Sequence, residues 1–332
     1  MRHDELLNDF LAALAALGPA QWCQAFFLFA ASGVAAVAVM PRDAKALLMD
    51  YGARKARDRR QPPADDKSDS GSGSGSARGP SPGWLLSLLA AATSCSQVPH
   101  SWFGAFYAVS LACSGFWLVQ FLGGGAVLRL VASSQAARAP GSSPTMGQVA
   151  LGWLMMSLQA ARRVYEHAVV LKPSKSTMWV VHWLLGLLFY LAMSVAVWVE
   201  GSGPILDPEA SHAVDAESLV KLVVGTPAFL FAWANQYRCH KHLAGLKKYS
   251  LPQEGMFRNY ICPHYTCECL LYLSLAVTTA PRGSWCNRTV LCAVVFVAVN
   301  LGVTASGTRK WYADKFGIGS VANKWNMIPL IF

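Results

Sequence analysis

Runs of apolar residues that are long enough to cross a lipid bilayer dominate this chain. The clearest is MWVVHWLLGLLFYLAMSVAVWV, residues 178–199, which contains no Asp, Glu, Lys or Arg. An α-helix needs about 20 such residues to cross about 30 Å of hydrocarbon. The composition agrees, because 54% of the residues are hydrophobic and only 14% are charged. The chain is therefore predicted to be a polytopic membrane protein.

The predicted fold class is all-α, with about seven transmembrane helices. We place them at residues 22–40, 104–122, 147–161, 178–199, 219–236, 266–280 and 289–307. A further apolar piece at residues 84–92 is too short to span and is expected at the membrane surface or in the core. Because Asp4, Glu5 and Asp9 precede the first span, it does not read as a cleaved signal peptide.

The distribution of Lys and Arg predicts the orientation of the chain. Residues 41–100, 162–177, 237–265 and 308–332 carry 22 of the 28 basic residues. By the positive-inside rule these segments face the cytosol, which makes the N-terminus lumenal and the C-terminus cytosolic. Membrane topology thus explains the net charge of +10, and no nucleic-acid partner is expected.

Three regions are expected along the sequence. Residues 1–40 hold an N-terminal segment and the first span, residues 41–97 form a cytosolic loop, and residues 98–332 form the main membrane domain. Within the loop, residues 57–83 are rich in Gly, Ser and Pro and contain no large apolar side chain. This composition predicts a disordered linker.

The stretch NYICPHYTCECLLYL, residues 259–273, looks at first like a metal site. Its spacing, C-x-H-x2-C-x-C, differs from the paired ligands of structural zinc, and no second pair follows it. If Pro263 occupies the first helical turn, His264 and Glu268 share one helix face, whereas Cys267 and Cys269 diverge. No metal is therefore expected, and the cysteines are interpreted as small buried side chains.

Glu268 carries the stronger signal in this stretch. A carboxylate just inside an apolar span is costly and marks a candidate functional site. It needs a polar partner, and His264 is the nearest candidate on the same face. The competing interpretation is an interfacial pair that solvates the end of the helix.

Several motifs in the C-terminal two thirds occur in a fixed order. They are VPHSWFGAFY (98–107), QAARRVYE (159–166), QYRCHKHLAGLKKY (236–249), LPQEGMFRNYICPHYTCE (251–268), GTRKWYADKFG (307–317) and the terminal NMIPLIF. Together they resemble the steroid 5α-reductase family, and within it the polyprenol (polyprenal) reductase branch of dolichol synthesis. The resemblance covers roughly residues 95–332.

The resemblance implies a seven-helix fold in the endoplasmic reticulum membrane that binds NADPH from the cytosolic side. It also implies reduction of a carbon–carbon double bond conjugated to a carbonyl. We expect a long-chain polyprenal as the substrate, because hydride adds readily to an alkene only when a carbonyl accepts the developing charge. The product would be converted to dolichol, which serves protein N-glycosylation.

The matching positions imply a set of cofactor-binding residues: Gln236, His240, Lys247, Tyr249, His264, Glu268, Arg309 and Tyr312. Lys248, Arg258 and Lys310 are further cations that could meet the phosphates. Two departures stand out, since Glu254 replaces the glycine of the steroid enzymes and Arg309 stands where animal relatives carry histidine. No G-x-G-x-x-G motif is present, so a Rossmann domain is not expected.

Tyr165 and Glu166 are the candidate catalytic residues that would hydrogen-bond the aldehyde oxygen. A doubly basic sequence followed by Tyr-Glu at the end of a span is costly unless it is used, although Arg162 and Arg163 could simply snorkel. His100 and Tyr107 are the reserve candidates.

Three alternatives remain at this point. The chain could reduce 3-oxo-Δ4-steroids or another enone, or it could be an isoprenylcysteine-type methyltransferase that uses S-adenosylmethionine. It could also be a noncatalytic seven-span receptor or scaffold, which gives no reason for polar residues to gather at the ends of the last three spans.

Overall fold

The computed structural model describes residues 8–9, 12, 15–49, 83–139, 141–172, 176–209, 214–247 and 250–332. The predicted linker at 57–83 lies outside these residues apart from Gly83. The described helices of eight or more residues are α2 (Pro19–Val39), α3 (Arg42–Met49), α5 (Trp84–Cys95), α6 (Gly104–Leu122), α7 (Ala126–Arg138), α8 (Met146–Tyr165), α9 (Val180–Val199), α11 (Ala216–Gly245), α12 (Pro263–Thr278) and α13 (Arg288–Phe316).

Each of the seven predicted spans is a helix in the structure. Five helical segments, Pro19–Val39, His100–Leu122, Val180–Val199, Ala216–Gly245 and Arg288–Phe316, are long and apolar enough to cross a membrane. The all-α class is confirmed apart from one short ribbon described below, and the multi-pass character is supported by these five helices. The count of seven and the orientation remain predictions.

The other two predicted spans, α8 and α12, lie within the same bundle but differ in character. α12 has 16 residues and measures about 24 Å at 1.5 Å per residue. α8 has 20 residues, but it buries Gln148, Gln159 and Arg162. Both helices pack against the other spans, and their polar side chains point inward.

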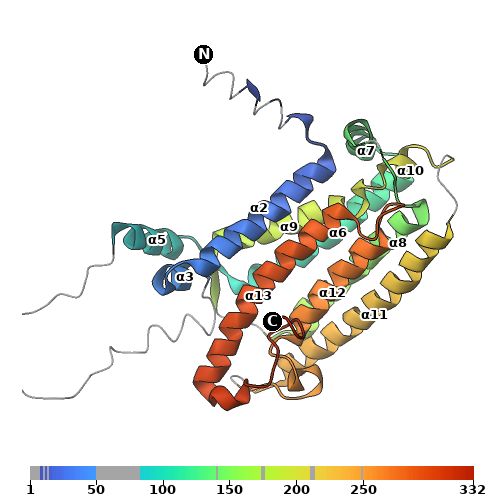
Figure 1. The fold of residues 1–332 in the computed structure, drawn as a ribbon. Helices are drawn as coiled ribbons and strands as arrows, with labels where there is room; N and C mark the ends of the chain where they lie inside the picture. The colour runs from blue at the N-terminus through green and yellow to red at the C-terminus, as the bar shows by residue number, and fades with distance from the viewer. Residues whose placement is uncertain are drawn as a thin grey trace, which may run out of the picture.

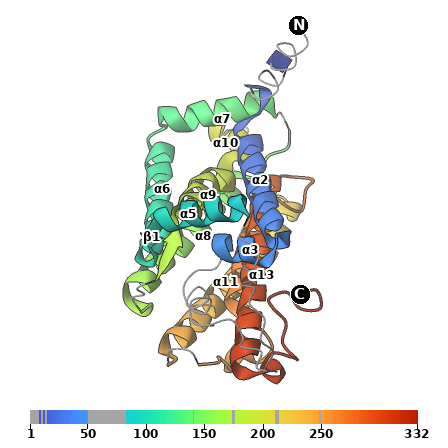
Figure 2. The same ribbon diagram turned by 90° about the vertical axis from the view of Figure 1, so that its left-hand side faces the viewer.

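The helices form a bundle that closes on itself (Figures 1 and 2). α11 packs on α12, α12 on α13, α13 on α2, and α2 on α9. α9 and α8 then pack on α6, and α8 completes the ring through contacts with α11 and α12. The C-terminal end of α11 and the N-terminal end of α12 therefore lie at one end of the bundle, beside the last turns of α13 (Figure 1).

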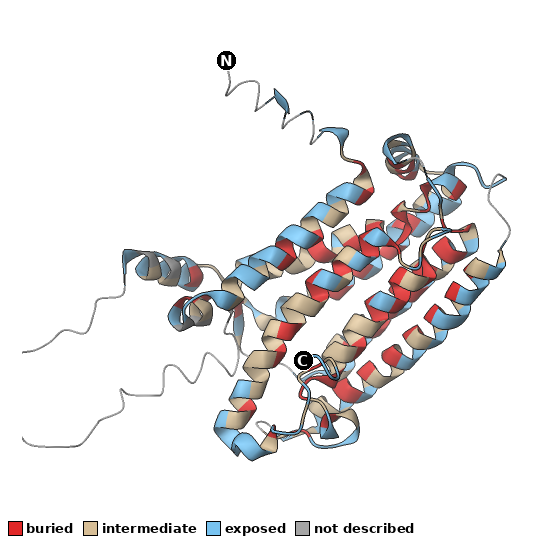
Figure 3. Ribbon diagram, viewed as in Figure 1, coloured by how far each residue is buried: buried red, intermediate tan, exposed pale blue. Residues whose placement is uncertain are grey.

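The interior of the bundle is apolar and aromatic. Phe27, Phe189, Tyr272 and Phe296 belong to one buried cluster to which α2, α9, α12 and α13 each contribute. Large apolar side chains are also exposed on the outward helix faces, among them Phe29 of α2 (Figure 3). A soluble monomer rarely exposes such continuous apolar surface, whereas lipid covers it at no cost.

Two short helices and a small ribbon flank the bundle. α5 packs on α3, and its C-terminal end leads into the strand β1 (Gln97–Pro99). β1 pairs antiparallel with β2 (Thr177–Trp179), which directly precedes α9. The sequence did not predict this ribbon. It ties the 84–95 segment to the start of α6 and α9, so the short apolar piece is a helix beside the bundle.

The C-terminal segment folds back onto the start of α12. The Ile261 amide donates to the Trp325 carbonyl at 2.8 Å, and the Cys262 amide donates to the Asn326 carbonyl at 3.0 Å. The Thr266 hydroxyl donates to the Met327 carbonyl at 2.6 Å. These bonds fix the loop before α12 and hence the first turn of that helix.

Candidate active site

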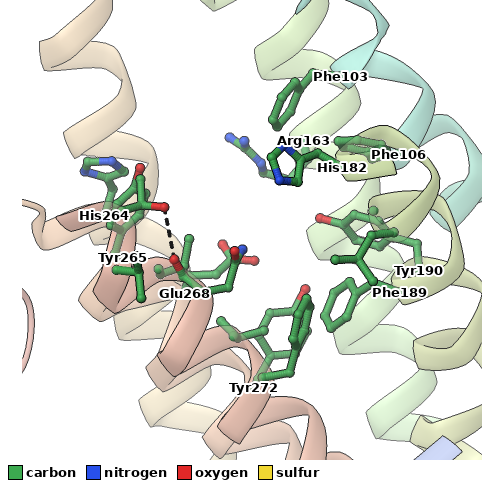
Figure 4. Close-up of a pocket in the computed structure, with 18 of the residues that line it drawn as sticks. Phe103, Phe106, Arg163, His182, Phe189, Tyr190, His264, Tyr265, Glu268 and Tyr272 are labelled. Atoms are coloured by element: carbon green, nitrogen blue, oxygen red, sulfur yellow. Dashed lines mark hydrogen bonds between the residues drawn. The ribbon is translucent and has the colours of Figure 1, made fainter. Parts of the chain in front are cut away.

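A cavity of about 310 Å³ lies inside the bundle, between α6, α8 and α9 on one side and α11, α12 and α13 on the other. Figure 4 shows its two walls. Phe103, Phe106, Phe189 and Tyr190 form an aromatic wall, and Glu268 points inward from the opposite side on α12. The cavity therefore joins an apolar surface to a polar one, as binding sites for small molecules commonly do.

Gln236 of α11 organises the polar wall. Its side-chain amide donates to the Glu268 carboxylate and, at 3.3 Å, to the His264 carbonyl. Pro263 is the first residue of α12, as predicted, and its missing N–H costs nothing there. The expected pairing of Glu268 with the His264 side chain is wrong, because its partner is Gln236 of α11, which lies 32 positions earlier in the sequence.

Behind Gln236 the network continues into α8. The Gln159 amide donates to the Gln236 side-chain oxygen at 3.1 Å, and Arg162 donates to that oxygen as well. Arg162 also donates to the Trp233 carbonyl, and its guanidinium lies 5.0 Å from the centroid of the Trp233 ring. Arg162 is thus a buried cross-link between α8 and α11 and does not snorkel.

Arg163 is the second arginine of this pair and lines the cavity. One guanidinium nitrogen donates to Glu166 and lies 2.8 Å from His240 Nδ1. The other donates to the Tyr107 hydroxyl, and the guanidinium carbon lies 4.5 Å from the centroid of that ring. Arg163 therefore joins α6, α8 and α11 at the edge of the cavity.

Glu166 completes this cluster from the short π-helical turn η2 (Glu166–Val170) that follows α8. Its side chain is fully buried, and its Oε2 lies 2.7 Å from His240 Nδ1. Burial disfavours the charged carboxylate, but the His240 hydrogen bond and the positive charges of Arg163 and Arg162 outweigh it and lower the pKa of Glu166 to about 2. Glu166 is therefore a carboxylate at neutral pH.

Four of the eight predicted cofactor-binding residues line the cavity together: Gln236, His240, His264 and Glu268. Lys247 is exposed, and Tyr312 is buried in a separate small cluster with Ile261 and Met327, so neither lines the cavity. Tyr249 lies outside the described residues, as does Lys248.

Arg309 also lies away from the cavity. Its guanidinium donates to the Lys324 carbonyl at 2.5 Å, to the Val321 carbonyl at 2.8 Å and to Asn326 Oδ1 at 3.3 Å. All of these acceptors belong to the C-terminal segment. In this structure Arg309 fastens that segment to α13.

The two predicted catalytic residues do not line the cavity. Tyr165 is 49% exposed, and Glu166 lies behind Arg163. Of the reserve candidates, Tyr107 lines the cavity and His100 does not. The structure thus brings the hydroxyl of Tyr107, rather than that of Tyr165, to the space where a ligand would lie.

Arg163, Tyr190 and Tyr272 are among the lining residues that sequence reasoning did not assign to the site. The signal for Arg163 was present in the doubly basic QAARRVYE segment, but sequence does not show which of two adjacent arginines faces inward. The two tyrosines fall in apolar runs, where an aromatic residue reads as ordinary core. Both tyrosines line the cavity because α9 and α12 lie on opposite sides of it.

The cysteines that made residues 259–273 resemble a metal site are packed side chains. Cys262 and Cys267 are buried, and Cys269 is partly buried. Among the described residues, no group of three or more His, Cys, Asp and Glu side chains is placed to hold a metal ion.

Comparison with known proteins supplies a family for this arrangement. Residues 176–332, which contain α9 to α13 and the C-terminal segment, match the family model described as 3-oxo-5-alpha-steroid 4-dehydrogenase. This match supports membership of the steroid 5α-reductase family. The matched region includes the polar wall of the cavity.

Individual relatives point to one branch of this family. The chain is 27% identical over 255 residues to polyprenal reductase 1 of Arabidopsis thaliana, covering 66% of this chain and 77% of that protein. It is 28% identical over 262 residues to polyprenal reductase of Xenopus tropicalis, covering 71% and 80% respectively. With polyprenal reductase 2 of Oryza sativa subsp. japonica the identity is 27% over 209 residues, and the match spans just over half of that protein, 58%.

Proposed function

We propose that this protein is an NADPH-dependent polyprenal reductase of the endoplasmic reticulum membrane. It reduces the double bond of the α-isoprene unit, next to the aldehyde, and supplies the saturated product for dolichol synthesis. Support comes from the family match, from relatives that are named polyprenal reductases, and from a cavity that joins an aromatic wall to a polar one.

The observation that carries the proposal is the contact between Arg163 and Tyr107 at the cavity edge. Arginine has only donors, so the Tyr107 oxygen accepts this bond and its own proton remains available for another acceptor. An aldehyde oxygen in the cavity is such an acceptor. A hydrogen bond from Tyr107 stabilises the negative charge that develops on this oxygen as the β-carbon is reduced.

The residues present fit the nicotinamide end of NADPH. A carboxamide has N–H donors and a carbonyl acceptor, and the polar wall offers the Glu268 carboxylate as an acceptor and the His264 ring as a donor. His264 Nδ1 is buried without a hydrogen-bond partner among the described protein atoms, which is costly unless a ligand supplies one. When bound, NADPH supplies the hydride.

The phosphates of NADPH would lie toward the end of the bundle where α11 ends and α12 begins. Lys247 and Arg258 are exposed near these helix ends, before α12. Cations at such positions suit the phosphate groups of a dinucleotide. Of the two other described cations expected there, Arg309 is engaged by backbone carbonyls and Lys310 is exposed.

The aromatic wall suits an isoprenoid. Phe103, Phe106 and Phe189 offer apolar surface to the first isoprene units, and Tyr107 lies on the same helix as Phe106. A cavity of about 310 Å³ lies at the lower end of the size of small-ligand pockets. A long polyprenyl chain must therefore leave the cavity and continue into the lipid, which an apolar bundle allows.

A second candidate substrate is a 3-oxo-Δ4-steroid. The matched family model carries the description of a steroid dehydrogenase, and a steroid enone presents the same conjugated carbonyl to Tyr107. The two substrates differ in shape rather than in chemistry. The structure holds the polar groups for either, so the distinction rests on the acceptor that is reduced.

The deciding experiment is a product assay with the purified full chain in detergent, NADPH, and polyprenal, polyprenol or a 3-oxo-Δ4-steroid as acceptor. We expect saturation of polyprenal only, with no reduction of the alcohol, because the alcohol lacks the conjugated carbonyl. Reduction of the steroid with polyprenal left untouched would refute the substrate. Binding of S-adenosylmethionine in place of NADPH would refute the reaction class.

A further inference from the structure

Glu166 is buried, charged and outside the cavity, and the proposed reaction does not use it directly. It begins a five-residue π-helical turn, a rare feature that often marks functional sites. Because its side chain is fully buried, an unpaired carboxylate here would cost several kcal/mol. The chain must therefore gain something from placing a carboxylate at this position.

The partners of Glu166 show what that gain is. Arg163, three positions earlier, donates to Glu166 Oε2, and Arg162, four positions earlier, has its Nε 3.4 Å from Oε1. His240 Nδ1 on α11 lies 2.7 Å from Oε2. Glu166 thus fastens the cavity-lining arginine on one helix and a cavity-lining histidine on another.

Arg163 in turn decides the orientation of the Tyr107 hydroxyl. Its guanidinium is a rigid fork of donors, so one arm on Glu166 fixes the direction of the other arm, which donates to Tyr107. With its oxygen accepting from Arg163, the Tyr107 hydroxyl can direct its proton elsewhere, toward the cavity that this residue lines. Three groups in series therefore lead from a buried anchor to the ligand space.

We propose that Glu166 is a positioning residue whose carboxylate holds Arg163 against Tyr107, so that the Tyr107 proton is directed to the substrate carbonyl. This inference rests on the proposed function and adds the residue that orients its proton donor. Glu166 does not itself donate a proton, because it is a carboxylate at neutral pH and Arg163 separates it from the cavity.

Glu166→Gln is the sharpest test, because glutamine keeps the shape and removes the charge. Loss of an oriented donor costs about 10²–10³ in rate where it is complete, and we expect a fall in kcat of at least about tenfold for this partial loss. KM for NADPH should rise by a smaller factor. Glu166→Asp, which keeps the charge, should recover part of kcat, and Glu209→Gln, which removes an exposed carboxylate, should behave as wild type.

A double-mutant cycle separates positioning from general folding. If Glu166 acts through Tyr107, Glu166→Gln should lower kcat in the wild-type background and have little further effect in Tyr107→Phe. A purely structural role predicts additive losses in the two backgrounds. Additive losses, or an unchanged kcat in Glu166→Gln, would overturn the inference while leaving the proposed reaction intact.

A measurement that needs no activity covers the case in which the substrate assignment fails. Thermal unfolding in detergent is recorded for wild type, Glu166→Gln, Tyr107→Phe and the double variant. Because Arg163 links Glu166 to Tyr107, Glu166→Gln should lower the unfolding temperature less in the Tyr107→Phe background than in the wild-type background.

The unfolding cycle and the product assay can fail independently. If wild type reduces no polyprenal but the two losses of stability are non-additive as expected, the proposed function is wrong and the Glu166 contact stands. If wild type is active and the two losses of stability are additive, Glu166 does not hold Arg163 on Tyr107. Should Glu166→Gln fail to accumulate in the membrane, the same two cycles with Glu166→Asp, whose side chain is one methylene shorter, decide the question.

Discussion

The two ends of the helical bundle both bury charged and polar side chains, yet only one end holds a candidate active site. At the far end, where α11 begins and α12 ends, Lys221 is almost completely buried and donates to Glu217 at 2.6 Å and to the Pro281 carbonyl at 2.7 Å. Gln148 there donates to the Thr278 carbonyl at 2.9 Å and to the Ala280 carbonyl at 3.1 Å. These bonds satisfy the orphan carbonyls at the end of α12 and in the turn that follows.

The network at the cavity end contains the same types of groups, but some of its hydrogen-bonding groups face the cavity. Gln236 donates to Glu268, and both residues line the cavity together with Arg163. No residue of the Lys221 network described above lines it. Burial of charge alone therefore does not identify a site in this protein; burial beside a cavity does.

The Asn287-Arg288-Thr289 sequon belongs to the far end and illustrates the point. Asn287 caps α13 through a bond from the Val290 amide to its Oδ1 at 2.9 Å, and its side chain is almost completely buried. Thr289 donates to Glu200 Oε1 at 2.7 Å and accepts from Gln24 at 2.9 Å. A glycosylation motif in the sequence is here a helix cap and a link between three helices.

Tyr107→Phe should give the largest effect at the cavity end. The substitution removes one hydroxyl and leaves the ring, so we expect kcat to fall by about 10²–10³ with KM for NADPH little changed. Steady-state kinetics on the purified protein measure both. Retention of more than about a tenth of wild-type kcat would remove Tyr107 from the role of carbonyl partner.

Glu268→Gln should come next, with a loss of about 10² in kcat/KM carried mainly by KM for NADPH. The amide cannot replace a carboxylate as a charge-assisted acceptor, and such a bond is worth about 1.5–3 kcal/mol. NADPH titration by fluorescence gives the Kd directly, and Glu209→Gln is the matched control. Unchanged Kd in a protein that inserts normally would place Glu268 outside the cofactor site.

Lys221→Met should affect stability and not catalysis, which is the sharpest contrast between the two ends. It leaves Glu217 and the Pro281 carbonyl without their donor, and we expect a loss of about 1–3 kcal/mol, reduced by the partial exposure of Glu217. Thermal unfolding in detergent reports the change. If kcat of the folded protein fell as well, the two networks would be coupled and the contrast would fail.

Arg309→Lys should give the smallest effect. Lysine keeps the charge but cannot reach several carbonyls with one planar fork, so the C-terminal segment should be held less tightly, at a cost of about 1 kcal/mol. Limited proteolysis of the last residues in the presence and absence of NADPH measures this. A rise of tenfold or more in the Kd for NADPH, with proteolysis unchanged, would instead place Arg309 on the cofactor phosphates.

Much of the fold could be predicted because the bilayer imposes simple rules on sequence. A run such as residues 178–199 must be a helix when no water is present to satisfy its backbone. For the same reason all seven predicted spans are helices in the structure. The β1–β2 ribbon escaped prediction because three-residue strands carry no periodic pattern, and their pairing joins residues about 80 positions apart.

The site was predictable where a polar residue lies in an apolar segment, because burying such a residue is energetically costly. Glu268 and His264 stood out in an apolar run, and both line the cavity. Gln236, the partner of Glu268, could not be predicted, because nothing in the sequence shows that this residue of α11 faces α12. Tyr165 and Tyr107 are both tyrosines beside polar residues in family-like motifs, and only helix packing shows that one is half exposed and the other lines the cavity.

Composition, local pattern and ordered motifs were enough to predict membrane helices and a resemblance to a known family, because each of these is read from one segment at a time. Which polar groups meet depends on how the helices pack. Contacts among Tyr107, Arg163, Glu166 and His240 join α6, α8 and α11. Such contacts arise from the packing of whole helices, and the long-range geometry that sets them is not written in any one segment of the chain.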